Sequence, residues 1–125
     1  MKIILDTYAW IEYFIGSDKG KIVEGYLKEE LITPFIVLLE LSYRADKEGW
    51  DFKKYYNFIK LKSRIPGIGE EFILGFGNFY NKIKGKSPNM EIADVIILMT
   101  AVKEQAKIVT GDEHFKSMQE VIYLG

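Results

Sequence analysis

Short apolar runs alternate with longer segments of helical spacing along this chain of 125 residues. An apolar run without polar alternation is typical of a strand that is covered on both faces. Short runs predict strands at residues 2–5, 31–33, 107–110 and 121–124. The segments between them stop at glycine or proline and predict helices at residues 7–15, 19–28, 35–48, 52–62 and 75–83. Strands that alternate with helices indicate an α/β domain with a mostly parallel central sheet.

The last long helix has the clearest start signal. Ser87 and Pro88 match the preferences for a helix cap and for the first helical position, so this helix is expected to run from there to about Gln105. Residues 71–74 fit either a strand or a helix start, and their pattern does not decide between the two. No internal repeat or linker interrupts the sequence, and its length suits one domain over residues 1–125.

Composition narrows the chemistry that the chain can support. Cysteine is absent, which excludes disulfides, thiolate metal sites and cysteine nucleophiles. The formal net charge of -1 predicts no strong overall attraction to nucleic acid or membranes, so any such binding depends on local patches. No apolar run approaches the ~18 residues of a membrane span, and the first residues read as a strand rather than a signal peptide. We therefore expect a cytoplasmic protein without membrane contact.

Four acidic residues lie in or directly after strongly apolar segments: Asp6, Glu40, Asp94 and Asp112. Ionised carboxylates are rarely buried unless they are paired or bind a metal. Asp6 follows the first predicted strand, and Asp112 follows the strand that ends at Thr110. Because the carboxyl ends of parallel strands meet at one edge of a sheet, these two should lie at the same edge. A helix N-cap is the alternative interpretation for each of them.

The two acids inside predicted helices have alternatives of their own. Asp94 has Ile97 and Leu98 as neighbours at helical spacing, and it stands about two turns into the predicted helix, too deep for a cap. A buried, hydrogen-bonded aspartate is the alternative there. Glu40 is followed four residues later by Arg44, and a local ion pair explains it as well as a functional role does.

One converging site accounts for all four acids together. Clustered carboxylates repel one another, and a divalent cation removes that conflict. Oxygen ligands suit Mg2+ or Mn2+, ions that lower the pKa of a bound water and polarise a phosphodiester. A glycosidase needs only two carboxylates across one bond, so the set favours metal-assisted hydrolysis of a phosphate ester.

Four segments carry a resemblance to a known family and span nearly the whole chain. They are IILDTYAWIEYF (3–14), FIVLLELSYR (35–44), EIADVIILMTA (91–101) and IVTGDEHF (108–115). In this order the chain resembles PIN-domain ribonucleases, specifically the small VapC-like toxins of type II toxin–antitoxin systems. An apolar strand followed by Asp-Thr-Tyr and an aromatic helix is the usual opening of that family.

The resemblance implies a three-layer α/β/α fold around a parallel sheet of four or five strands. It implies a catalytic site of Asp6, Glu40, Asp94 and Asp112, in which Asp6, Asp94 and Asp112 bind Mg2+ or Mn2+ and Thr110 helps to order the site. The implied reaction is endonucleolytic cleavage of RNA by a metal-activated water. Members usually form homodimers and are silenced by a cognate antitoxin, so both partners are expected.

Three more residues stand near these motifs. Glu91 precedes Asp94 by one turn and is placed to support the metal through water. Glu113 stands beside Asp112, where a basic or neutral residue is more usual in the family, and is interpreted as a solvated charge. His114 is the only histidine, which excludes a histidine-rich zinc site, and it is expected at the surface or outside the direct metal ligands.

Basic side chains gather in residues 50–86, which carry eight of them against three acidic ones. A basic helical pair with the interleaved Tyr55, Tyr56 and Tyr80 would hold a phosphate backbone and stack unpaired bases. A solvated basic face, with the aromatics in the core or in a dimer interface, explains the pattern equally well. The candidate RNA-binding residues are Lys53, Lys54, Lys60, Lys62, Arg64, Lys82, Lys84 and Lys86.

Two other functions stay open at this point. A PIN-like module that only binds nucleic acid, without a toxin role, has the same sequence features. A receiver-like regulatory domain that binds Mg2+ requires paired acids after the first strand, where this chain has Asp6 alone. The Gly85-Lys86-Ser87 segment is no phosphate-binding loop, because Tyr80 occupies the position of the required upstream glycine.

Overall fold

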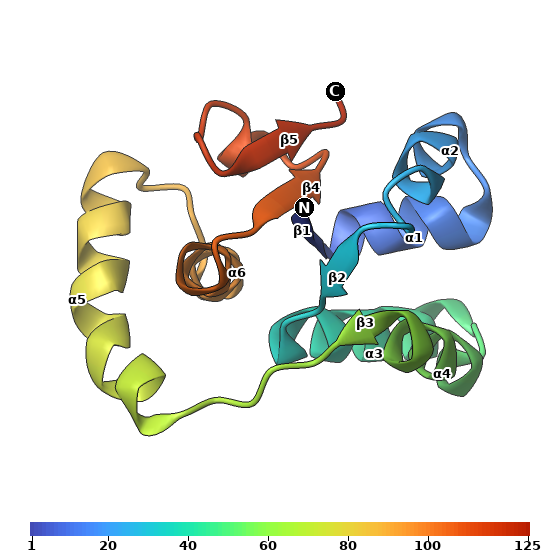
Figure 1. Cartoon of the computed structure of the whole chain (residues 1–125), viewed down its shortest axis with the longest axis horizontal. Helices are drawn as coiled ribbons and strands as arrows, with labels where there is room; N and C mark the ends of the chain where they lie inside the picture. Colours follow the sequence, from blue (N-terminus) through green and yellow to red (C-terminus); the bar gives the residue numbers. More distant parts are fainter.

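The computed structural model describes residues 1–125 and contains a sheet of five strands that all run parallel (Figure 1). The strand order is β3-β2-β1-β4-β5. The central strand β1 (Lys2–Leu5) pairs with β2 (Glu30–Ile32) and β4 (Lys107–Thr110), and the edges are β3 (Ser63–Arg64) and β5 (Val121–Tyr123). The predicted α/β class with a parallel sheet of four or five strands is confirmed.

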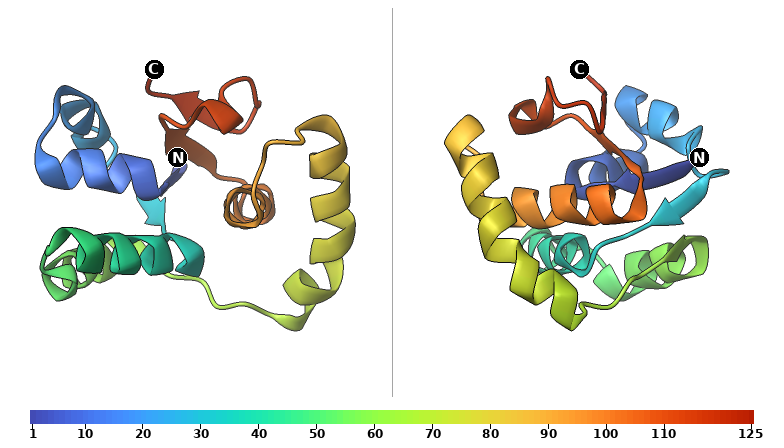
Figure 2. Two further views of the ribbon diagram at one scale, coloured as in Figure 1. Left: turned by 180° about the vertical axis from the view of Figure 1, so that it is seen from behind. Right: turned by 60° about the vertical axis from the view of Figure 1, so that its left-hand side comes forward.

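Helices cover both faces of this sheet, which gives three layers. In Figures 1 and 2, α1 and α2 lie on one side of the strands and α6 lies on the other, with α5 outside it. The helix pair α3 and α4 lies near the β2–β3 edge. The bounds are α1 Thr7–Ile15, α2 Asp18–Glu24, α3 Phe35–Glu48, α4 Phe52–Lys62, α5 Glu70–Lys86, α6 Ile92–Glu104 and the short 3-10 helix η1 Glu113–Phe115.

The two central strands form the middle of the core. Ile3 and Ile4 of β1 and Ile108 and Val109 of β4 are fully buried. Since α1 packs on one face and α6 on the other, the last three residues of each strand are buried whichever face they point to, which explains the missing polar alternation. Burial of each such side chain stabilises the fold by about 1.5–3 kcal/mol.

The predicted start of the last long helix at Ser87 and Pro88 is wrong. Ser87 instead ends α5, because its N–H donates to the Ile83 carbonyl at 2.7 Å. A turn follows, and the Lys84 ammonium binds the carbonyls of Pro88 and Met90 at 2.7 and 2.9 Å. These contacts stabilise the turn, so α6 begins only at Ile92.

Three smaller differences concern element limits. Residues 71–74 belong to the first turns of α5, which starts at Glu70. The second helix ends at Glu24 and gives way to turns, rather than continuing to residue 28. The two-residue strand β3 has no counterpart in the prediction, because Ser63 and Arg64 show no apolar pattern. None of the helices has both the length and the apolar character needed to cross a membrane.

Candidate active site

Asp6 stands at the carboxyl edge of the sheet, between β1 and α1. Its carboxylate accepts a hydrogen bond from the Ala9 backbone N–H at 2.8 Å and caps α1. The other carboxylate oxygen accepts a hydrogen bond from the Thr110 hydroxyl at the end of β4. Only 4% of Asp6 is exposed. The cap and the position at the sheet edge, which the sequence offered as alternatives, therefore occur together.

Thr110 joins Asp6 to the turn that carries Asp112. While its hydroxyl donates to Asp6, the same oxygen accepts the Asp112 backbone N–H at 2.9 Å. The Asp112 carboxylate accepts the His114 N–H at 2.9 Å and caps η1. Gly111 in this turn lies so close to the Tyr8 ring that a Cβ atom would come within 2.3 Å of it. A larger residue at this position would therefore have to displace the Tyr8 ring.

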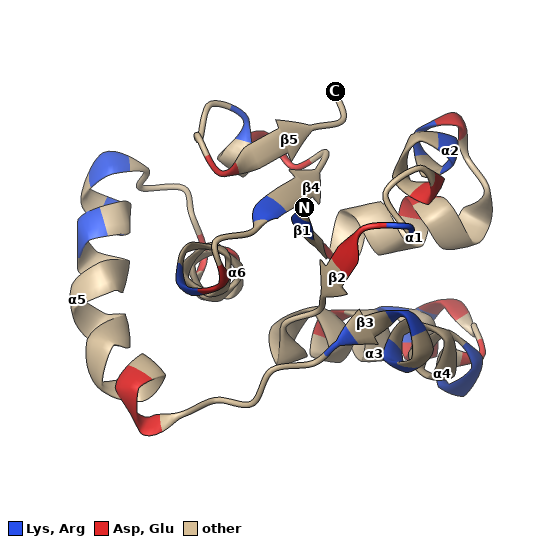
Figure 3. Ribbon diagram, viewed as in Figure 1, with Lys and Arg blue, Asp and Glu red and all other residues tan.

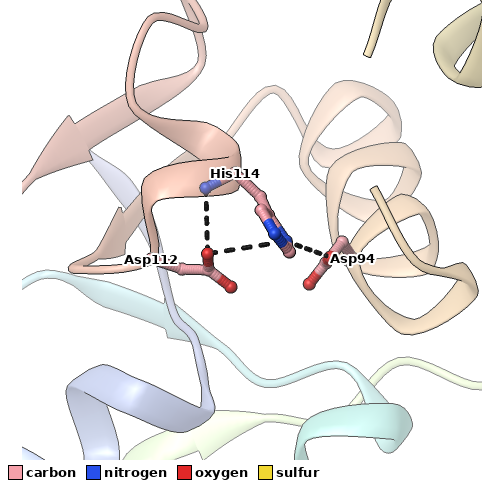
Figure 4. Close-up of side chains that lie close together, drawn as sticks. All are labelled: Asp94, Asp112 and His114. Atoms are coloured by element: carbon pink, nitrogen blue, oxygen red, sulfur yellow. Dashed lines mark hydrogen bonds and ion pairs between the residues drawn. The ribbon is translucent and has the colours of Figure 1, made fainter. Parts of the chain in front are cut away.

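Asp94 faces Asp112 across the side chain of His114 (Figure 4). The Nδ1 atom of His114 lies 3.2 Å from an Asp94 carboxylate oxygen and 3.6 Å from an Asp112 carboxylate oxygen. Because α6 begins at Ile92, Asp94 is in its first turn, and its carboxylate also accepts the Glu91 N–H at 3.1 Å. The interpretation of Asp94 as too deep for a cap was wrong.

Glu40 reaches the same region from the middle of α3. Its carboxylate accepts a hydrogen bond from the Thr7 hydroxyl at 2.6 Å. Arg44, its proposed local partner, instead pairs with Glu48 at 3.5 Å. The local ion pair is therefore absent, and Glu40 is held toward the first turn of α1.

Burial and mutual repulsion shift the titration of this cluster. Burial raises the pKa of Asp6 to about 7, although hydrogen bonds from Thr110 and Ala9 lower it. Burial likewise raises the pKa values of Glu40 and Asp94, and the charge of Asp112 adds to each of these shifts. The hydrogen bond to Asp94 raises the pKa of His114. The cluster therefore holds more negative charge at neutral pH than its surroundings favour.

The donor set fits a divalent cation. No lysine or arginine forms an ion pair with any of the four carboxylates, and their one nearby basic group is His114. Donor atoms of Asp94, Asp112 and His114 all lie within 4.8 Å of one another. A hard cation among such oxygens offsets their repulsion.

Sequence reasoning missed one residue of this cluster, Thr7, which is adjacent to Asp6 and whose hydroxyl was the available signal. His114 is exposed, as expected for a residue at the surface, and its ring lies beside two of the carboxylates. Glu113 is exposed, and Glu91 is an exposed N-cap residue of α6 whose charge contributes to the raised pKa values of Glu40 and His114.

The predicted basic helical pair does not form, because α4 and the lysine-bearing end of α5 lie on opposite sides of the molecule (Figure 3). Arg64 is engaged by Glu104, and Lys84 by the turn before α6. The four lysines of α4 make one group, and Lys82, Lys84 and Lys86 make another. Tyr55, one of the tyrosines proposed to stack on bases, stacks instead on Phe14 of α1, with 4.2 Å between the ring centroids.

The model of the PIN domain family matches residues 3–121. The chain belongs to the PIN domain family. Its strand order also differs from the 2-1-3-4-5 order of receiver domains, so the receiver-like alternative has no support. No curated protein matches the sequence.

Solved structures share the fold of this PIN domain at low sequence identity. A toxin–antitoxin complex from Klebsiella pneumoniae aligns with a TM-score of 0.77 and 17% identity over 98% of both chains. VapBC2 from Rickettsia felis, bound to a DNA fragment from the promoter, aligns with a TM-score of 0.74 and 21% identity, over 98% of this chain and 97% of that one. VapBC-1 from nontypeable Haemophilus influenzae aligns with a TM-score of 0.69 and 20% identity, over 99% of this chain and 98% of that one.

Proposed function

We propose that this PIN domain is a metal-dependent endoribonuclease and the toxin of a toxin–antitoxin pair. The observation that carries the proposal is the convergence of Asp6, Glu40, Asp94 and Asp112 from four separate segments, without a lysine or arginine partner. Mg2+ or Mn2+ fits these oxygens. The fold shared with toxin–antitoxin complexes supports the biological role.

The carboxylates divide the work of hydrolysis according to their positions. Asp94 and Asp112, together with the buried Asp6, would hold the divalent ion. When bound, that ion lowers the pKa of a water molecule and polarises the scissile phosphate. Glu40, oriented by the Thr7 hydroxyl, positions the attacking water and accepts its proton. The water oxygen bonds to phosphorus as the bond from phosphorus to the leaving sugar oxygen breaks.

Thr110 and Glu91 hold the proposed metal ligands in place through hydrogen bonds. Thr110 fixes the Asp6 carboxylate and the Asp112 backbone through one hydroxyl, so it sets the distance between two ligands. The Glu91 backbone N–H holds the Asp94 carboxylate in place. Bonds of this kind keep ligands in the orientation that the ion requires.

The lysines of α4 are our candidates for RNA contact. Lys53 and Lys54 are exposed near its start and Lys60 and Lys62 near its end, and the helix has no acidic residue. Helix α4 packs against α3, which carries Glu40. Neutralising these lysines should weaken RNA binding and reduce its salt dependence.

A second protein chain is the proposed partner of α5. This helix of 17 residues contains no buried residue, although it carries many large apolar side chains. Ile73 and Leu74 are 64% and 76% exposed, and a hollow of about 270 Å³ between α5 and α6 is lined only by apolar side chains. We propose a homodimer through α5 and separate inhibition by an antitoxin. Light scattering of Leu74→Glu should show a monomer if α5 forms the dimer.

Cleavage of RNA tests the proposal. Purified protein is incubated with single-stranded RNA in Mn2+ and in EDTA, and wild type is compared with Asp94→Asn. Asp18→Asn is the matched control, because Asp18 is an exposed aspartate in the first turn of α2. We expect cleavage by wild type and Asp18→Asn in Mn2+ only. Equal cleavage in EDTA, or full activity of folded Asp94→Asn, would refute the mechanism. RNA binding without cleavage would instead favour the alternative of a PIN-like module that only binds nucleic acid.

A further inference from the structure

His114 projects into the carboxylate cluster rather than away from it. Its Nδ1 atom is 3.2 Å from Asp94 and 3.6 Å from Asp112. Metal bonds of about 2.1 Å at right angles place neighbouring donor atoms about 3 Å apart. The Nδ1 atom therefore already stands near the separation of adjacent ligands from both carboxylates, and the three donor atoms all lie within 4.8 Å of one another (Figure 4).

The position of His114 is set by its neighbours on η1. The Asp112 carboxylate accepts the His114 backbone N–H, which fixes the turn. The next residue, Phe115, is 1% exposed and anchors η1 in the core. The imidazole is thus held at the rim of the cluster by backbone and core contacts, while its side chain keeps 38% exposure for entry of an ion.

We propose that His114 supplies a nitrogen ligand to the metal and gives the site a preference for Mn2+ and other transition metals over Mg2+. This inference rests on the proposed metal site. Carboxylates alone suit Mg2+ and Mn2+ alike, whereas imidazole binds transition metals much better than it binds Mg2+. The site is therefore a mixed nitrogen and oxygen site rather than an oxygen-only one.

The chain offers an unusually direct spectroscopic test, because His114 is its only histidine. Protein without a histidine tag is loaded with Mn2+ and examined by pulsed electron paramagnetic resonance for coupling to a bound imidazole nitrogen. We expect a 14N signal that changes to a 15N signal when the protein is labelled with 15N-histidine. His114→Asn should lose the signal while retaining the fold, since Phe115 still anchors η1.

Metal titrations provide the second readout. We expect His114→Asn to weaken Mn2+ binding by about tenfold or more and to change Mg2+ binding by less than about threefold. Glu113→Gln is the matched control, because Glu113 is the exposed neighbour and should leave both affinities unchanged. Equal losses for the two ions would overturn the selectivity.

The outcomes separate this inference from the proposed function. Mn2+ that binds in an Asp94-dependent manner without nitrogen coupling overturns the role of His114 and leaves the nuclease proposal intact. If Mn2+ does not bind to the wild-type cluster at all, both proposals fail. Nitrogen coupling that follows the histidine label supports the assignment of His114 as a ligand.

Discussion

The Thr7 hydroxyl donates a hydrogen bond to the Glu40 carboxylate at 2.6 Å and joins the first turn of α1 to the middle of α3. These residues are 33 positions apart, and Thr7 directly follows Asp6, the N-cap residue of α1. The bond orients the one carboxylate of the cluster that no backbone N–H holds. It also favours the ionised form of Glu40 against burial, which raises its pKa.

Loss of the Thr7 hydroxyl should therefore impair catalysis more than stability. Thr7→Val keeps the side-chain shape but leaves Glu40 without its donor, so we expect the rate of RNA cleavage to fall by about tenfold and its lower pH limit to move upward. Thr7→Ser should keep most of the activity. Rates measured across pH provide the check, and an unchanged profile for Thr7→Val would show that the hydroxyl does not act on Glu40.

Asp6 should make the metal-free protein less stable as pH rises. Its pKa is about 7 in the folded protein and lower in the unfolded chain, so the folded form binds more protons between these values. The free energy of unfolding then falls as pH rises through this range, by up to about 4 kcal/mol for this group. Glu40, Asp94 and His114 act in the same direction.

Replacement of Asp6 by asparagine removes this penalty. Asp6→Asn should be more stable than wild type at pH 8 in EDTA and should lose part of the pH dependence, while RNA cleavage is abolished. Denaturant unfolding at pH 5 and pH 8 measures both effects. Wild type that gains stability as pH rises in EDTA would contradict the raised pKa.

Two glycines in helices should respond oppositely to alanine. A Cβ atom on Gly20 in α2 would lie 2.0 Å from the Glu12 carbonyl oxygen of α1, so Gly20→Ala must separate the two helices and should destabilise by several kcal/mol. Gly77 in α5 has no atom within 4 Å of such a Cβ, and Gly77→Ala should stabilise by about 0.5–1 kcal/mol. Thermal unfolding of both variants gives the comparison.

Trp10 combines full burial with an unsatisfied donor. The side chain is 0% exposed and packs on Phe14 at 5.5 Å, yet its indole N–H has no hydrogen-bond partner. Trp10→Phe removes the unpaired donor along with part of the packing, so it should cost less than about 1.5 kcal/mol. Trp10→Ala leaves a cavity and should cost about 3–5 kcal/mol. Similar losses in the two variants would contradict the small cost expected for Trp10→Phe.

The sequence predicts the sheet-edge part of the cluster better than its helical part. Asp6 and Asp112 follow apolar runs, and the geometry of parallel strands alone brings such positions together. The depth of Asp94 was misjudged because Ser87 and Pro88 carry a strong local start signal. The contacts of Lys84 with the following turn outweigh that signal, and they depend on tertiary geometry rather than on propensity.

The side-chain directions of Thr7 and His114 lay beyond sequence reasoning for a related reason. Whether a residue beside an acid points into the cluster depends on the rotation of α1 and η1 about their axes, which core packing fixes. The strand β3 escaped prediction because Ser63 and Arg64 pair through their backbone with β2, and their side chains carry no strand pattern.

The hydrogen bond from Thr110 to Asp6 spans 104 residues of sequence. Such a contact closes a long loop, and the entropic cost of that closure must be offset by the strand pairing around it. A nascent or partly folded chain in which β4 has not yet paired with β1 lacks Asp112 at the cluster and the Thr110 hydroxyl that holds Asp6. On the proposed function, the carboxylate cluster is complete only in molecules that have completed the sheet, and proteolytic removal of β4 and β5 would separate Asp112 from the other three carboxylates.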